Sequence, residues 1–155
     1  MIYLDSSAIV KLIHRESESA ALIEWLNRRP ESALVSSALA AVEVPRAVRR
    51  YAPQALAGVT AVMARLYLLD MDAVVRETAA ALPDPTLRSL DTIHVASALL
   101  ARAEGPALLL AYDKRLLSSA ALAGLPVLSG VNSCPFCLTK PGNRCSCRPC
   151  HRTGR

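Results

Sequence analysis

Residues 1–130 contain no cysteine, and aromatic residues make up only 4% of the sequence. The first absence excludes a disulfide framework from this part of the chain. The second leaves an aliphatic core, rich in alanine and leucine. At 155 residues and 52% hydrophobic content, the chain is long enough for one buried core and short for two. We therefore expect a single domain with an appendage.

Two further absences bear on location. No basic and apolar leader opens the sequence, and its apolar runs are too short to span a membrane. We expect a soluble, cytoplasmic protein that does not contact a membrane.

Acidic residues are absent from residues 131–155, which hold five of the 18 Lys and Arg residues. The residues before them are balanced in charge, so the net charge of +5 belongs to this tail. Any affinity of residues 1–130 for a polyanion must then come from local patches or from a bound cation.

Short apolar segments alternate with stretches of helical periodicity along the first 130 residues. The segments predicted to be strands are residues 2–4, 33–35, 67–71, 107–111 and 126–128. Alternation without hairpin signals predicts a parallel sheet covered by helices on both faces. The expected fold is therefore a three-layer α/β/α domain with a five-stranded parallel sheet over residues 1–130, followed by a short Cys-rich tail, residues 131–155.

Four acidic residues are candidates for one site. Asp5 and Asp113 each follow a predicted strand, and Asp91 begins a buried helix, so the carboxyl edge of the sheet could hold all three. Glu43 has apolar helical neighbours, where an unpaired charge is costly. Simpler alternatives are that Asp5 only caps the next helix and that Glu43 pairs with Arg46.

Four carboxylates in one pocket repel by several kcal/mol per close pair at an effective dielectric of about 20. Such a cluster needs protonation or a divalent cation, and an all-oxygen donor set favours Mg²⁺ or Mn²⁺ over Zn²⁺. That site would suit phosphodiester hydrolysis. An aspartyl-phosphate phosphohydrolase is an alternative, although Ser7 stands where its second acid is usually found. His94 is interpreted as a hydrogen-bonded core histidine outside the site.

Several short segments surround these acids in a recognisable order. They are IYLDSSA at residues 2–8, SAL at 37–39, EVPRA at 43–47, LRSLDTIHVA at 87–96 and YDKRL at 112–116. In order and approximate spacing they resemble the VapC toxins of the PIN-domain family, over residues 1 to about 130.

The resemblance implies a metal-dependent endoribonuclease, the toxin of a type II toxin–antitoxin system. The positions that match the family's acidic quartet, which holds one or two Mg²⁺ or Mn²⁺ ions and cleaves RNA, are Asp5, Glu43, Asp91 and Asp113. Ser6 or Ser7 would supply a supporting hydroxyl. The resemblance also implies a homodimer and a small VapB-like antitoxin. In one departure, Ala111 stands where the family often has Ser or Thr.

The tail has the spacing of metal ligands. Cys134 and Cys137 would provide two ligands of a tetrahedral Zn²⁺ site. Two later residues would complete it, and the candidates are Cys145, Cys147, Cys150 and His151. The expected pair is Cys147 and Cys150. The alternatives are an extension without structure of its own or an artefact of the reading frame, because VapC toxins normally end near residue 130.

A second interpretation of the whole chain comes from another functional class. In it, the acidic pocket is vestigial, and the protein is a non-catalytic module that binds nucleic acid or a partner. The basic tail would then provide the nucleic-acid contact.

Overall fold

Five parallel strands form a single sheet in the computed structural model, which describes residues 1–129. The strands are β1 (Ile2–Leu4), β2 (Leu34–Ser37), β3 (Tyr67–Leu69), β4 (Leu108–Ala111) and β5 (Val127–Ser129). Their order across the sheet is β3-β2-β1-β4-β5, and every neighbouring pair is parallel. The predicted five-stranded parallel sheet is confirmed. The zinc ligands predicted in the tail lie outside the described residues.

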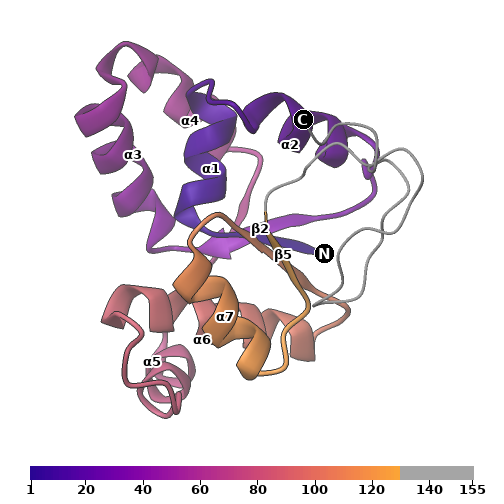
Figure 1. The fold of residues 1–155 in the computed structure, drawn as a ribbon, viewed down its shortest axis with the longest axis vertical. Helices are drawn as coiled ribbons and strands as arrows, with labels where there is room; N and C mark the ends of the chain where they lie inside the picture. Colours follow the sequence, from indigo (N-terminus) through magenta and orange to yellow (C-terminus); the bar gives the residue numbers. More distant parts are fainter. Residues whose placement is uncertain (130–155) are drawn as a thin grey trace, which may run out of the picture.

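Helices cover both faces of the sheet. They are α1 (Ser6–Ile13), α2 (Ser19–Asn27), α3 (Ala40–Tyr51), the 3₁₀ helix η1 (Pro53–Gly58), α4 (Val59–Met63), α5 (Ala73–Ala80), α6 (Ser89–Ala103) and α7 (Lys114–Leu122). Helices α1 to α4 lie on one side and α5 to α7 on the other, which gives three layers (Figure 1). None of the helices within residues 1–129 is both long enough and apolar enough to cross a membrane.

The central strand shows how the sequence builds these layers. Successive side chains of a strand point to opposite faces, so β1 contributes to two cores. Ile2 and Leu4 pack with residues of α1 and α3, whereas Tyr3 packs with residues of α6 and α7. All three are buried, which is why this strand is apolar throughout rather than alternating.

The strand order places a topological switch point between β1 and β4. The chain winds outward from β1 through β2 to β3 and then returns to β4 on the other side of β1. The backbone N–H of Asp5 donates to the carbonyl of Leu110 at 3.2 Å, so the two strand ends lie side by side. In an open α/β sheet, this is where ligands bind.

One predicted helix differs in detail. Helix α6 begins at Ser89, two residues before the predicted start at Asp91. The difference does not move Asp91 away from the carboxyl edge of the sheet.

Candidate active site

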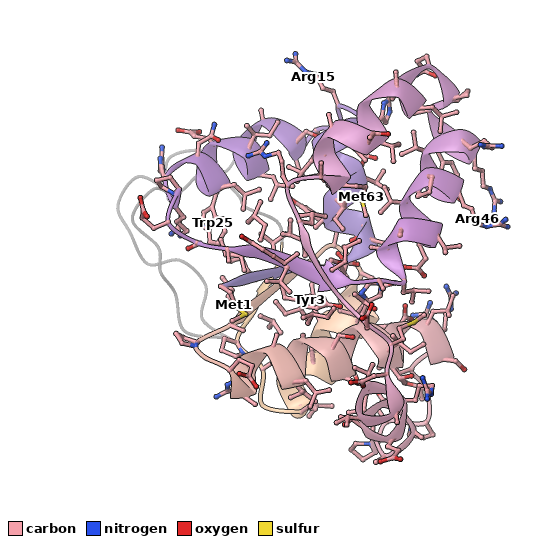
Figure 2. All side chains as sticks on the ribbon, turned by 180° about the vertical axis from the view of Figure 1, so that it is seen from behind. Met1, Tyr3, Arg15, Trp25, Arg46 and Met63 are labelled. Atoms are coloured by element: carbon pink, nitrogen blue, oxygen red, sulfur yellow. The ribbon has the colours of Figure 1, made fainter. Side chains whose placement is uncertain are left out.

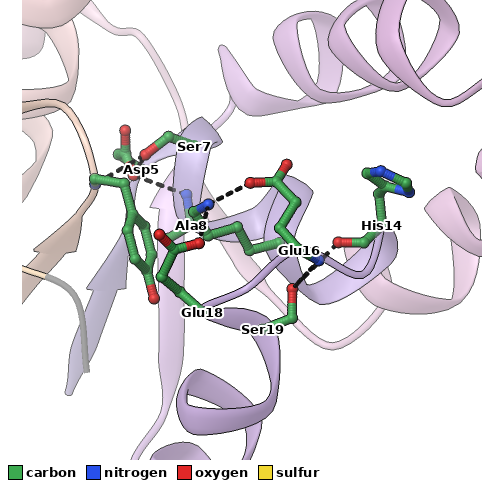
Figure 3. Close-up of polar contacts among 9 residues, drawn as sticks. Asp5, Ser7, Ala8, His14, Glu16, Glu18 and Ser19 are labelled. Carbon is green, nitrogen blue, oxygen red and sulfur yellow. Dashed lines mark hydrogen bonds and ion pairs between the residues drawn. The ribbon is translucent and has the colours of Figure 1, made fainter. Parts of the chain in front are cut away.

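Asp5 occupies the turn between β1 and α1 and is only 4% exposed. Its Oδ1 accepts hydrogen bonds from Ser7 Oγ at 2.8 Å and from the backbone N–H of Ala8 at 3.0 Å (Figure 3). Asp5 therefore caps α1 as well as standing at the sheet edge, and the two interpretations of this residue are compatible. Burial raises the pKa of the Asp5 carboxyl above its ordinary value, although the nearby His94 and the hydrogen bonds oppose the rise.

Ser7 joins the ends of the two central strands. Its hydroxyl donates to Asp5 and accepts from the backbone N–H of Tyr112 at 3.0 Å. This hydroxyl therefore lies beside the end of β4, where the chain has Ala111 in place of a hydroxyl residue. Asp5 and the backbone that precedes Asp113 are held together through one side chain.

Glu43 reaches the site from α3. Its Oε2 accepts a hydrogen bond from Ser6 Oγ at 2.5 Å and lies 2.9 Å from His94 Nε2. Burial raises the pKa of Glu43, but the hydrogen bonds from His94 and Ser6 outweigh that effect, and its pKa is lowered. Among the described residues the hydrogen-bond partners of the Glu43 carboxylate are Ser6 and His94. The alternative pairing with Arg46 is wrong, since Arg46 points outward from α3 (Figure 2).

His94 lies on α6 and is 2% exposed. Its Nδ1 is 2.9 Å from the hydroxyl oxygen of Tyr3, and its Nε2 faces Glu43 and, at 3.3 Å, Ser6 Oγ. The prediction of a hydrogen-bonded core histidine is confirmed. The sequence interpretation nevertheless missed that its partner is a candidate site residue. The available signal was spacing, because residues three apart share one face of a helix and Asp91 precedes His94 by three.

Asp91 and Asp113 complete the set. Asp91 lies in the first turn of α6, and Asp113 caps α7 by accepting from the backbone N–H groups of Arg115 at 2.8 Å and Leu116 at 3.3 Å. Burial, then the charge of Asp113, raises the pKa of Asp91; Glu43 adds to the rise, while Arg88 and His94 oppose it. Asp91, Asp113 and Glu43 are thus close enough to interact through their charges.

The four acids share one edge of the sheet, and Asp91 interacts electrostatically with Asp113 and Glu43, but the site is not a finished coordination shell. Within residues 1–129, no three acidic, histidine or cysteine side chains are already spaced to hold a metal ion together. The donor chemistry fits a hard divalent cation, because every candidate ligand is a carboxylate oxygen. The partly exposed side chain of Asp91 could rotate toward such an ion, whereas hydrogen bonds hold Asp5 and Asp113.

Comparison with known proteins gives consistent results. Residues 2–122 match the PIN domain family. Over 130 residues the chain is 48% identical to the ribonuclease VapC35 of Mycobacterium tuberculosis, covering 83% of this chain and 96% of that protein. Over 128 residues it is 41% identical to the ribonuclease VapC46 of the same species, with the same coverage of 83% and 96%.

A solved structure has a similar fold. It is a toxin–antitoxin complex from Klebsiella pneumoniae, in which a chain superposes with a TM-score of 0.63 at 18% identity. The match covers 83% of this chain and 97% of that one. At this identity the likeness is one of fold.

Proposed function

The chain belongs to the PIN-domain family, with VapC ribonucleases as its relatives, and we propose that it is a metal-dependent endoribonuclease that acts as the toxin of a type II toxin–antitoxin system. The observation that supports the proposal is the 48% identity to a ribonuclease, in a chain whose four candidate carboxylates come from separate elements of the fold. The alternative of a vestigial pocket has no comparable support.

We assign the cation site to Asp5, Glu43, Asp91 and Asp113. A Mg²⁺ or Mn²⁺ ion bound there would bind a phosphate oxygen, lower the pKa of a bound water and stabilise charge on the leaving oxygen. Asp5 and Glu43 would serve as fixed ligands, because each carboxylate already accepts two hydrogen bonds. Asp113 also accepts two hydrogen bonds, from the backbone at the start of α7, so Asp91 would be the mobile ligand. Ser6 and Ser7 orient the fixed pair.

Basic side chains beside the acids are suited to hold the RNA backbone. Arg46, Arg49 and Arg50 are exposed on α3, the helix that carries Glu43, and Arg88 immediately precedes α6. Contacts with phosphate groups provide affinity without sequence specificity. We therefore propose that these residues position the RNA, and that the cleavage sequence is selected elsewhere on the surface.

The proposed partners follow from the family. We expect a homodimer and a VapB-like antitoxin, and the toxin–antitoxin complex from Klebsiella pneumoniae has the same fold. We propose cytoplasmic action, with residues 1–130 as the nuclease domain and residues 131–155 as a separate tail. In the tail, Cys134, Cys137, Cys147 and Cys150 are proposed Zn²⁺ ligands, which elemental analysis of anaerobically purified protein would detect as about one Zn²⁺ per chain.

The test is RNA cleavage by the purified chain. Single-stranded or loop RNA should be cleaved with Mg²⁺ or Mn²⁺, and excess EDTA should stop the reaction. Asp5→Asn should abolish cleavage, while Glu31→Gln, a change at an exposed acid before the amino end of β2, should leave it unchanged. Cleavage that persists in EDTA would contradict the metal mechanism. Binding of RNA without cleavage under any metal condition would support the non-catalytic alternative.

A further inference from the structure

A line of hydrogen bonds runs from the interior of the protein to the candidate site. Tyr3, fully buried on β1, places its hydroxyl oxygen 2.9 Å from His94 Nδ1. On the other side of the ring, Nε2 lies 2.9 Å from Glu43 Oε2. Figure 2 shows Tyr3 in the interior between the sheet and the helices. These three residues come from β1, α6 and α3, so the line connects both helical layers through the sheet.

The chemistry of the three groups determines which atom donates each hydrogen bond. A neutral imidazole has one N–H donor and one acceptor nitrogen, and a carboxylate can only accept. Glu43 therefore requires a proton on Nε2, and in the neutral ring this leaves Nδ1 as an acceptor for the hydroxyl of Tyr3. With this tautomer each polar atom in the line has a complementary partner. The other tautomer would bring the Nε2 lone pair against the Glu43 carboxylate.

The Glu43 carboxylate is held at one of its two oxygens. Ser6 and His94 both bind Oε2, whereas Oε1 accepts no hydrogen bond from the part of the chain that the structure describes. Two donors on one oxygen restrict rotation of the carboxylate and leave the other oxygen for a ligand. We propose that His94 and Tyr3 are positioning residues that hold Glu43 through Oε2 so that Oε1 can bind a divalent cation.

This inference rests on the proposed function, and its alternative is that the line of hydrogen bonds only stabilises the fold. Hydrogen-bonding partners behind a metal ligand typically change metal affinity by about 10- to 100-fold. A purely structural role would lower the melting temperature and leave metal affinity unchanged. Metal affinity therefore separates the two roles.

The experiment titrates the full-length chain with Mn²⁺ by isothermal calorimetry. His94→Leu should weaken Mn²⁺ binding by about 10- to 100-fold, and Tyr3→Phe by less than that, because Glu43 still favours the proton on Nε2. His94→Gln, whose amide N–H₂ can replace the Nε2–H donor, should recover part of the affinity. Val95→Ala truncates a fully buried neighbour on the same helix. It should lower the melting temperature without changing the Mn²⁺ affinity.

A spectroscopic readout tests the same line without activity. Nitrogen NMR of the histidine rings should report an Nε2–H tautomer for His94 in the wild type, and a larger share of the Nδ1–H form in Tyr3→Phe. The His94→Gln spectrum identifies the resonance, since the chain has three histidines.

The outcomes distinguish two failures. If the wild type binds Mn²⁺ and folded His94→Leu and Tyr3→Phe bind it equally well, the inference is overturned and the proposed function stands. The inference is also overturned if Val95→Ala weakens binding as much as His94→Leu does. If the wild type binds no Mn²⁺, the metal-dependent function and this inference are both overturned.

Discussion

Two parts of the candidate site are built differently. The carboxylates of Asp5, Glu43 and Asp113 each accept two hydrogen bonds from side chains or backbone. Asp91 is partly exposed, and no group within residues 1–129 donates a hydrogen bond to its carboxylate. Asp5, Glu43 and Asp113 form the fixed part of the site, and Asp91 is its adjustable part. A cation site of this kind binds on fixed ligands and is completed by a side chain that moves.

A second contrast lies inside the fixed part, between Asp5 and Glu43. The pKa of the buried Asp5 is raised, and that of the partly exposed Glu43 is lowered. The difference follows from their surroundings: burial dominates at Asp5, whereas hydrogen bonds from His94 and Ser6 overcome burial at Glu43. Charge on Asp5 is therefore unfavourable in the metal-free protein, and charge on Glu43 is already stabilised.

The largest expected effect on RNA cleavage comes from a substitution in the fixed part of the site. Asp5→Asn should reduce RNA cleavage by more than about 100-fold, because it removes a charged ligand, a larger loss than that of an outer hydrogen-bonding partner. Asp113→Asn should reduce it less, because Asp113 is partly exposed whereas Asp5 is buried. Single-turnover rates at saturating Mn²⁺ would measure both, and equal rates for Asp5→Asn and wild type would show that the site is misassigned.

Metal binding should raise the thermal stability of the protein. A ligand that binds only the native state, at a concentration about 100 times its dissociation constant, adds about 2.7 kcal/mol to the free energy of unfolding. For a chain of this size that is a rise in melting temperature of about 5 to 10 °C. Glu43→Gln should shrink the Mn²⁺-dependent rise, measured by differential scanning fluorimetry with and without millimolar Mn²⁺. Identical melting of metal-free and metal-loaded wild type would exclude a site.

The opposite pKa shifts of Asp5 and Glu43 predict opposite effects of pH on the stability of the metal-free protein. Asp5 has a raised pKa, so its contribution to stability is present below its unfolded pKa of about 3.9 and is lost as pH rises through the folded value. Asp5→Asn should therefore raise the melting temperature near pH 7 by a few degrees. Asp91→Asn should act in the same direction.

For Glu43 the dependence of stability on pH has the opposite sign. Its lowered pKa stabilises the protein above the unfolded pKa of about 4.3, and that contribution is lost as pH falls through the folded value. Glu43→Gln should lower the melting temperature at neutral pH and have little effect under acidic conditions. Thermal melts from pH 3 to pH 8 would check both signs, and parallel curves for the two variants would refute the contrast.

The smallest effect concerns the tail. Residues 131–155 carry five basic residues and no acid, unlike the balanced domain before them. Deleting them should weaken RNA binding at low salt and reduce its salt dependence, while metal-dependent cleavage continues. Filter binding at two salt concentrations would measure this. Unchanged affinity would assign all RNA contacts to the nuclease domain.

Much of the fold could be predicted from the sequence, because each apolar segment is short, buried and separated by helical periodicity. The positions of Asp5 and Asp113 after strands placed them at one edge without knowledge of strand order. The partner of Glu43 could not be predicted in this way. Helical spacing pointed to Arg46, a local neighbour, whereas the actual partner, His94, is 51 residues away.

The same limit applies to two other contacts. Ser7 and Tyr112 are 105 residues apart, and Tyr3 and His94 are 91 apart. Such pairs depend on the order of strands and on how the helices pack, which periodicity does not specify. Tyr3 in particular belongs to an apolar strand pattern, and only its packing against α6 reveals the use of its hydroxyl.

The most direct test is to locate the cation. Crystals of the full-length chain grown with Mn²⁺ and measured at the manganese absorption edge should give an anomalous peak at the carboxyl edge of the sheet. We expect the ion to contact Asp5 and Glu43, with the side chain of Asp91 turned toward it. An ordered site without an anomalous peak, or a peak elsewhere on the domain, would contradict it.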